Sequence, residues 1–179
     1  MTEGPWPLFS PAAELRPCSM ALDTGRSRSA EPPVPPGPTS GAIVVGIDGS
    51  PAARAALAWA VEHARRISLP ILAVSAWSLP ADVEGPVSPE IERYVRNRLA
   101  ETIAEVVGDS SVTVTADVLR GQADAILVEL SGSASLLVVG CQGQGNGEPT
   151  ERLLGDVSER VVTHAHCPVV VVRAGARWT

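Results

Sequence analysis

The chain has 179 residues, of which 45% are hydrophobic and 19% charged, so it can form one domain with a hydrophobic core and a tail. Its formal net charge of −6 argues against nucleic acid and anionic membranes as partners, because both attract basic surfaces. The cysteines Cys18, Cys141 and Cys167 are too few and too scattered for a disulfide framework or a zinc site. No apolar run is long enough for a membrane span, and the N-terminus lacks a signal-peptide pattern, so we expect a cytoplasmic protein.

The first 40 residues differ in composition from the rest of the chain. They contain nine prolines and no sustained apolar periodicity, so we expect residues 1–40 to form a disordered or polyproline-like extension. Met20 offers an alternative start within this extension. Residues 41–179 are therefore expected to carry the fold as one domain.

From residue 41 onward, short β-branched runs alternate with segments of helical spacing. Ser50–Pro51 and Ser88–Pro89 each place a capping residue before a proline, which is typical of a helix start. A Pro- and Gly-rich loop is expected over 79–87, and a glycine-rich loop over 140–155. The pattern predicts strands at about 42–47, 71–77, 112–119, 135–140 and 168–173, and helices at about 51–67, 89–106, 123–130 and 157–165.

Five strands separated by helices predict a parallel sheet with right-handed crossovers. The first and fourth strands are the most β-branched, so we expect them to be central and buried on both faces. In such sheets ligands lie beyond the carboxyl ends of the strands, where the strand order reverses. The candidate site therefore comprises Asp48–Gly49–Ser50 and the segment from Gly140 to Ser158.

Both segments have a possible chemical role and a structural alternative. The Asp48 carboxylate can accept a hydrogen bond from a ribose hydroxyl or an adenine amine, or Asp-Gly-Ser can serve only the turn. The amides of the glycine-rich loop can converge on an anion beside a helix N-terminus, but glycine is also common in flexible loops. The loop is not a P-loop, because the chain contains no lysine. A phosphate would have to be held by amides, hydroxyls or arginine.

The remaining motifs give weaker evidence for a functional site than these two segments do. His164 and His166 are two residues apart and cannot share a metal on one helix face. Cys141 is interpreted as a small apolar filler, since no cation adjacent in sequence would lower its pKa. A serine hydrolase is not indicated, because the sequence contains no Gly-x-Ser-x-Gly motif.

The apolar run 169–172 would promote aggregation at an open sheet edge, so we expect a symmetric homodimer through strand 168–173.

Over about residues 41–174 the sequence resembles the universal stress protein family. The matching segments are Ile43–Ser50, Val118–Gly121, Leu136–Gly143 and Leu154–Arg173. The resemblance implies an α/β fold of the flavodoxin-like, Rossmann-like type: a parallel five-stranded sheet of order 3-2-1-4-5 with helices on both faces. It also implies a homodimer through the fifth strand and, in one branch of the family, ATP in the crevice between the first and fourth strands. We expect a regulatory protein with at most weak ATP hydrolysis.

In that branch, the residue that matches Asp48 contacts the adenosine. The loop follows the pattern Gly, two residues, Gly, nine residues, Gly, then Ser or Thr. The resemblance thus gives a set of candidate contacts to the nucleotide. They are Ile47, Asp48, Ala76, Gly140, Gly143, Gly145, Gly155, Asp156, Val157 and Ser158.

The loop departs from the family pattern in two ways. Eleven residues separate Gly143 from Gly155, and counting from Gly145 restores nine but puts Gln142 at the earlier glycine position. Asp156 stands where a hydroxyl is expected; as an N-cap it would compete with a phosphate, and its charge would repel one. A bridging Mg²⁺ or the hydroxyl of Ser158 would offset this.

Three functional hypotheses follow from these residues. The first is a nucleotide-binding regulatory protein whose ATP binding is weakened by the altered loop. The second is a homodimeric interaction module of the same fold without a nucleotide. The third, an enzyme of a related adenine-handling fold, is disfavoured because neither a Ser-Gly-Gly loop after the first strand nor a His-x-Gly-His signature is present.

Overall fold

The structure of the protein is a computed structural model, and it describes residues 41–79, 89–143 and 153–175. The predicted extension over residues 1–40 lies outside these ranges, as does Gly145 of the glycine-rich loop. Within the described ranges, no helix is both long enough and apolar enough to cross a membrane.

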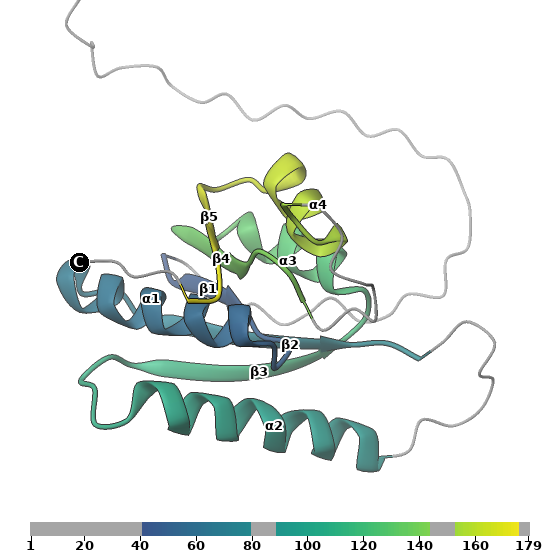
Figure 1. Cartoon of the computed structure of the whole chain (residues 1–179), viewed down its shortest axis with the longest axis horizontal. Coiled ribbons are helices and arrows are strands. Elements are labelled where there is room, and N and C mark those ends of the chain that lie inside the picture. The colour runs from purple at the N-terminus through teal and green to yellow at the C-terminus, as the bar shows by residue number, and fades with distance from the viewer. Residues whose placement is uncertain (1–40, 80–88, 144–152, 176–179) are drawn as a thin grey trace, which may run out of the picture. The chain divides into compact units, whose positions relative to one another are not determined.

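Five strands and four helices alternate along the described residues, in the predicted order (Figure 1). They are β1 (Ile43–Gly46), α1 (Pro51–Ile67), β2 (Ile71–Trp77), α2 (Pro89–Val107), β3 (Val114–Arg120), α3 (Ala123–Ser131), β4 (Leu136–Gly140), α4 (Asp156–His164) and β5 (Val169–Val172). The largest difference in boundaries is at β3, which was predicted from residue 112. It begins later because its partner β2 starts at Ile71, which lies opposite Val114.

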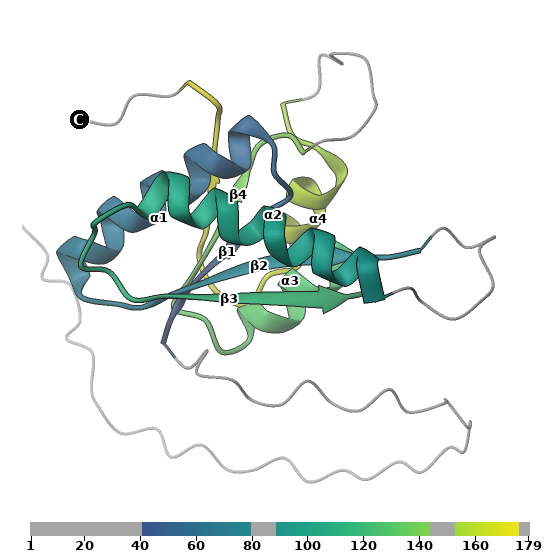
Figure 2. The same ribbon diagram turned by 90° about the horizontal axis from the view of Figure 1, so that it is seen from below.

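All strand pairs are parallel, and the strand order is β3-β2-β1-β4-β5, which confirms the predicted topology. In the centre, Ile43 of β1 lies between Ile71 of β2 and Leu136 of β4. Helices α1 and α2 cover one face of the sheet, and α3 and α4 cover the other (Figures 1 and 2). The central position of β1 and β4 explains their apolar, β-branched sequences.

Side chains of β1 alternate between two hydrophobic cores. Ile43 and Val45 pack with Leu57 on the side of α1 and α2. Val44 packs with Leu127 on the side of α3 and α4. Because both faces are occupied by core residues, the carboxyl ends of the strands form the edge where polar groups can meet a ligand.

Helix α1 begins as its sequence predicts. Ser50 is the N-cap, its Oγ accepts a hydrogen bond from the Ala53 amide at 3.1 Å, and Pro51 occupies the first helical position. The helix ends at Ile67, and the C-cap residue Ser68 has a left-handed backbone with φ 55°. Small residues dominate the buried face of α1, which lets the helix lie close to the sheet. The buried residues are Ala52, Ala53, Ala56, Leu57, Ala60, Val61 and Ala64.

Candidate functional site

The candidate site lies where the chain leaves the sheet in two opposite directions. After β1 the chain enters α1 on one face, and after β4 it leads to α4 on the other (Figure 1). The Oγ of Ser50 donates to the Gln142 carbonyl at 3.4 Å, which joins the two segments across the sheet end. The amide of Gly155 donates to the Cys141 carbonyl at 2.7 Å, so the start of α4 joins the same group.

Asp48 is exposed at the end of β1, and its carboxylate is held in place. Its Oδ1 accepts a hydrogen bond from the Ser50 amide at 2.9 Å. A Cβ added at Gly143 would lie 2.5 Å from Asp48 Oδ2, a distance at which something must shift. Gly143 therefore lets the loop after β4 approach the carboxylate. Gly49, between Asp48 and Ser50, has a φ of +82°, which favours glycine at that position.

Gly140 at the end of β4 contacts both helices that flank the site, α1 through Ala52 and α4 through Ser158. A Cβ at Gly140 would lie 2.8 Å from the backbone carbon of Ala52, so the glycine allows α1 to pack against the end of β4. Ser158 is buried, and its Oγ donates to the Gly140 carbonyl at 2.6 Å. The hydroxyl proton of Ser158 is therefore engaged within the fold, whereas the sequence suggested that it was offered to a phosphate.

The expectation that Asp156 caps α4 is wrong. Gly155 is the N-cap, with φ −78° and ψ 163° and no side-chain capping bond, and Asp156 is the first helical residue. The reason is that the Gly155 amide bonds Cys141, which fixes Gly155 in the extended conformation of a cap. Asp156 and Glu159 both lie in the first turn, where the helix dipole favours acids. Val157, between them, is 39% exposed.

The remaining predicted residues lie at the ends of β1 and β2. Ile47 is buried; its amide donates to Val74, and its carbonyl accepts from the Ser75 hydroxyl. Ala76 is half-buried in β2. Since Gly46 pairs with Val74, continuing the register brings Ala76 level with Asp48. Thus every predicted site residue in the described ranges lies at this end of the sheet, and Gly145 lies outside those ranges.

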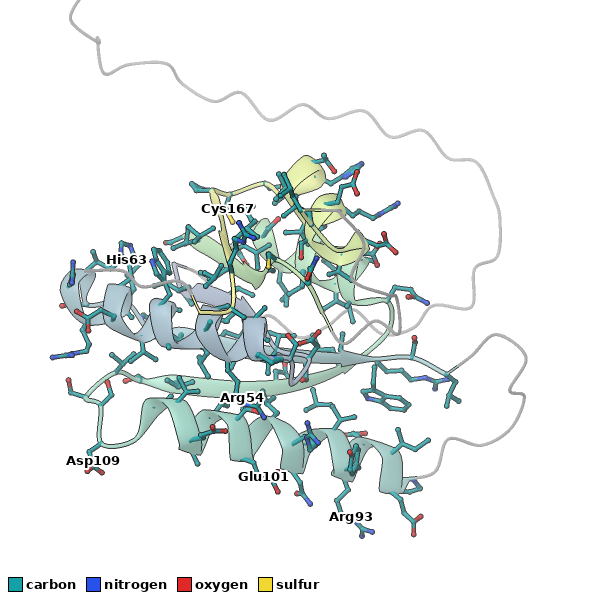
Figure 3. The ribbon with its side chains drawn as sticks, viewed as in Figure 1. Arg54, His63, Arg93, Glu101, Asp109 and Cys167 are labelled. Carbon is teal, nitrogen blue, oxygen red and sulfur yellow. The ribbon has the colours of Figure 1, made fainter. Side chains whose placement is uncertain are left out.

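Arg54 belongs to this region and escaped prediction from the sequence. It points from α1 toward α2 (Figure 3), where its Nε lies 3.3 Å from Oε2 of Glu105. Its Nη1 donates to the Gly49 carbonyl at 3.3 Å. The sequence does place a basic residue one helical turn after the Asp-Gly-Ser segment. Its role could not be predicted, because its partner Glu105 lies 51 positions further along the chain (105 − 54).

In the described part of the site, Cys141 takes part through its backbone carbonyl, and we assign no role there to the cysteine and histidine side chains. Cys141 is a buried thiol. Cys167 is half-buried, and burial raises the pKa of its thiol above the ordinary value, outweighing backbone contacts that lower it. His164 and His166 are exposed. Within the described ranges, no group of three or more His, Cys, Asp or Glu side chains is arranged to hold a metal ion.

The doubly wound parallel sheet, whose strand order reverses between β1 and β4, defines a flavodoxin-like α/β protein. The profile of the universal stress protein family matches residues 40–173. The chain belongs to this family.

Among its relatives is Universal stress protein Rv2623 of Mycobacterium tuberculosis (strain ATCC 25618 / H37Rv), which is 37% identical over 146 residues. That match covers 76% of this chain and 48% of Rv2623, so the chain spans about half the length of this relative.

Two solved structures share the fold. The universal stress protein from Archaeoglobus fulgidus in complex with dAMP has a TM-score of 0.56 and 23% identity, with 75% of this chain and 98% of that chain covered. A universal stress protein family protein from Arabidopsis thaliana with AMP bound has a TM-score of 0.52 and 22% identity, with 76% and 93% covered.

Proposed function

We propose that this chain is a regulatory stress-response protein that binds an adenine nucleotide in the crevice between the ends of β1 and β4. The observation that carries the proposal is the exposed carboxylate of Asp48, held by the Ser50 amide and approached by Gly143. A carboxylate fixed before binding loses little freedom when it accepts a hydrogen bond from a ribose hydroxyl or adenine amine. Solved relatives of the same fold carry dAMP and AMP, which supports the same ligand class here.

The start of α4 favours a nucleotide with one phosphate over a triphosphate. The Gly155 amide is engaged with Cys141, and the hydroxyl proton of Ser158 is engaged with Gly140. The acids Asp156 and Glu159 stand in the first turn of the helix. Two like charges 4 Å apart repel by about 1 kcal/mol in water and by about 4 kcal/mol at an effective dielectric of 20, so each added phosphate raises the cost. ATP is therefore expected to bind weakly and to need Mg²⁺.

The proposed role is regulatory, with no catalytic step assigned to the crevice, and the proposed place of action is the cytoplasm. Both described cysteines, Cys141 and Cys167, are free thiols, which fits a reducing compartment.

The experiment is calorimetric titration of the purified full chain with AMP and with ATP plus Mg²⁺, after release and identification of any co-purified nucleotide. We expect AMP to bind and ATP to bind more weakly. Absence of binding to either nucleotide would contradict the proposal and favour the second candidate below. Tighter binding of ATP than of AMP would contradict only the inference about α4.

The second candidate function is a homodimeric interaction module, and the edge strand β5 favours it. In the described part of the chain β5 pairs with β4 alone, and its residues Val169–Val171 are only half-buried. A second copy that covers this edge would bury them and satisfy the open backbone groups. A dimer through β5 is also compatible with nucleotide binding.

Val170→Glu tests this interface, because a buried, unpaired charge at the strand edge opposes association. We expect the wild-type chain to sediment as a dimer and the variant as a monomer. Val162→Glu is the matched control, because Val162 is 46% exposed on α4. If Val170→Glu still sediments as a dimer, association occurs through another surface.

A further inference from the structure

Arg54 holds the same peptide group that holds Asp48. Its Nη1 donates to the Gly49 carbonyl at 3.3 Å, and the amide that follows this carbonyl is that of Ser50. This Ser50 amide donates to Asp48 Oδ1 at 2.9 Å. Because a peptide group is planar, a bond to its carbonyl also orients its N–H. Hydrogen bonds on both ends of one peptide group polarise each other, so the bond from Arg54 strengthens the bond to Asp48.

Arg54 is itself held by a second helix. Its Nε lies 3.3 Å from Oε2 of Glu105 on α2, and the two side chains are 37% and 66% exposed. The Nε atom is buried and makes no hydrogen bond with the residues that the structure describes. The contact with Glu105 is therefore an attraction between charges and not an aligned hydrogen bond, and its partial exposure weakens it.

We propose that Arg54 is a positioning residue for Asp48, and that Glu105 links the nucleotide affinity of the site to the placement of α2. This inference rests on the proposed function, since it assigns Asp48 to ligand binding. Its physical chain is short: Glu105 attracts the guanidinium, the guanidinium holds the Gly49 carbonyl, and the same peptide group holds the carboxylate. By linkage, a partner that displaced α2 would change nucleotide affinity, and a bound nucleotide would oppose that displacement.

The chain offers matched controls for both residues. Arg65 lies on the same helix and pairs with Glu62 at 3.1 Å, away from the Asp48 turn. Glu101 lies one helical turn before Glu105 on α2 and is exposed (Figure 3). Arg65→Ala and Glu101→Gln remove the same charges as Arg54→Ala and Glu105→Gln without touching the Gly49 carbonyl.

The first experiment needs no ligand. Hydrogen exchange of the Ser50 amide is measured by NMR in the full chain and in its variants. We expect exchange to be about tenfold faster in Arg54→Ala and about twofold faster in Glu105→Gln, because local opening becomes easier when the peptide group loses its second bond. Arg54→Lys keeps the charge but loses the planar fork, so it should restore only part of the protection. The two control variants should match the wild type.

The second experiment is a double-mutant cycle on AMP affinity, followed by NMR titration. We expect Arg54→Ala to weaken AMP binding about tenfold, within the usual range of coupling between sites. In an Asp48→Ala background the same change should cost nothing further, because the group that Arg54 positions is gone. A merely structural role for Arg54 would instead weaken binding equally in both backgrounds.

The results separate this inference from the proposed function. If the wild-type chain does not bind AMP, the proposed function fails, whereas Ser50 exchange still decides whether Arg54 positions the turn. Unchanged Ser50 exchange in Arg54→Ala and Arg54→Lys would overturn the role of Arg54. Equal losses of AMP affinity in both Asp48 backgrounds would also overturn it. An effect of Glu101→Gln as large as that of Glu105→Gln would overturn the link to α2.

Discussion

The two segments that follow β1 and β4 at the carboxyl end of the sheet start their helices in different ways. After β1, three side chains fix the turn. Ser50 caps α1, the Asp48 carboxylate accepts a hydrogen bond from the Ser50 amide, and Arg54 donates one to the Gly49 carbonyl. After β4, helix α4 starts at Gly155 without a side-chain cap, and acids follow at once. The first segment is organised before a ligand arrives, and the second opposes extended negative charge. Under the proposed function, this comparison predicts that the part of the site near Asp48 binds the nucleoside more strongly than the start of α4 binds the phosphates.

The largest expected effect concerns the contact that holds the two segments together. Gly140→Ala would bring a Cβ to 2.8 Å from the backbone of Ala52, so α1 must shift away from β4. We expect the free energy of unfolding to fall by about 3 kcal/mol, the upper end for overpacking in a core. Urea unfolding measures it.

Gly155→Ala is the matched control on the α4 side. A Cβ at Gly155 meets its nearest atom, Cα of Gln142, at 3.6 Å, an ordinary contact. Replacing an N-cap glycine by alanine should cost less than about 1 kcal/mol. Equal losses in the two variants would mean that the two segments are packed with the same tolerance, against the comparison.

The next effect concerns the nucleoside half. Asp48→Asn keeps a side chain that suits the turn but removes the charge. We expect AMP affinity to fall by about 2 kcal/mol, or about 30-fold, the usual value of a hydrogen bond to a charged group. Asp109→Asn, at the other end of the sheet beyond α2 (Figure 3), should leave calorimetric binding of AMP unchanged. Equal AMP affinity in wild type and Asp48→Asn would remove Asp48 from the site.

The smallest effect concerns the phosphate half. Asp156→Ser removes a charge from the first turn of α4 and should tighten ATP binding by about 1 kcal/mol, or about fivefold, with a smaller gain for AMP. Glu129→Gln, on the exposed side of α3, is the charge-matched control. If ATP affinity does not rise, the inserted loop residues and not the acid limit the triphosphate.

The sequence predicted the fold because local signals agreed with one another. β-branched runs marked the central strands, and Ser50–Pro51 marked the start of α1, as the structure confirms. Such features depend on the residue itself and its near neighbours in the chain. The edge that carries Asp48, Gly140 and Gly143 could be located for the same reason, since the topology determines where the carboxyl ends of the strands meet.

Details of the site depend on distances that no local pattern contains. Asp156 has a high capping propensity, but the bond from Gly155 to Cys141 moves the cap one residue earlier. The sequence predicts that the Ser158 hydroxyl faces a ligand, but in the fold this hydroxyl donates to the Gly140 carbonyl 2.6 Å away. The contact between Arg54 and Glu105 exists only because α1 and α2 pack side by side.

The alanine-rich face of α1 determines how far this helix lies from the sheet. Ser50 and Arg54 are carried on a helix whose distance from the sheet is set by side chains of one carbon, such as Ala56 and Ala60. A larger residue at either position would push helix α1 away from the sheet and move the Asp48 turn away from Gly143. Under the proposed function, substitutions at these two buried positions would therefore change nucleotide affinity without contacting the nucleotide.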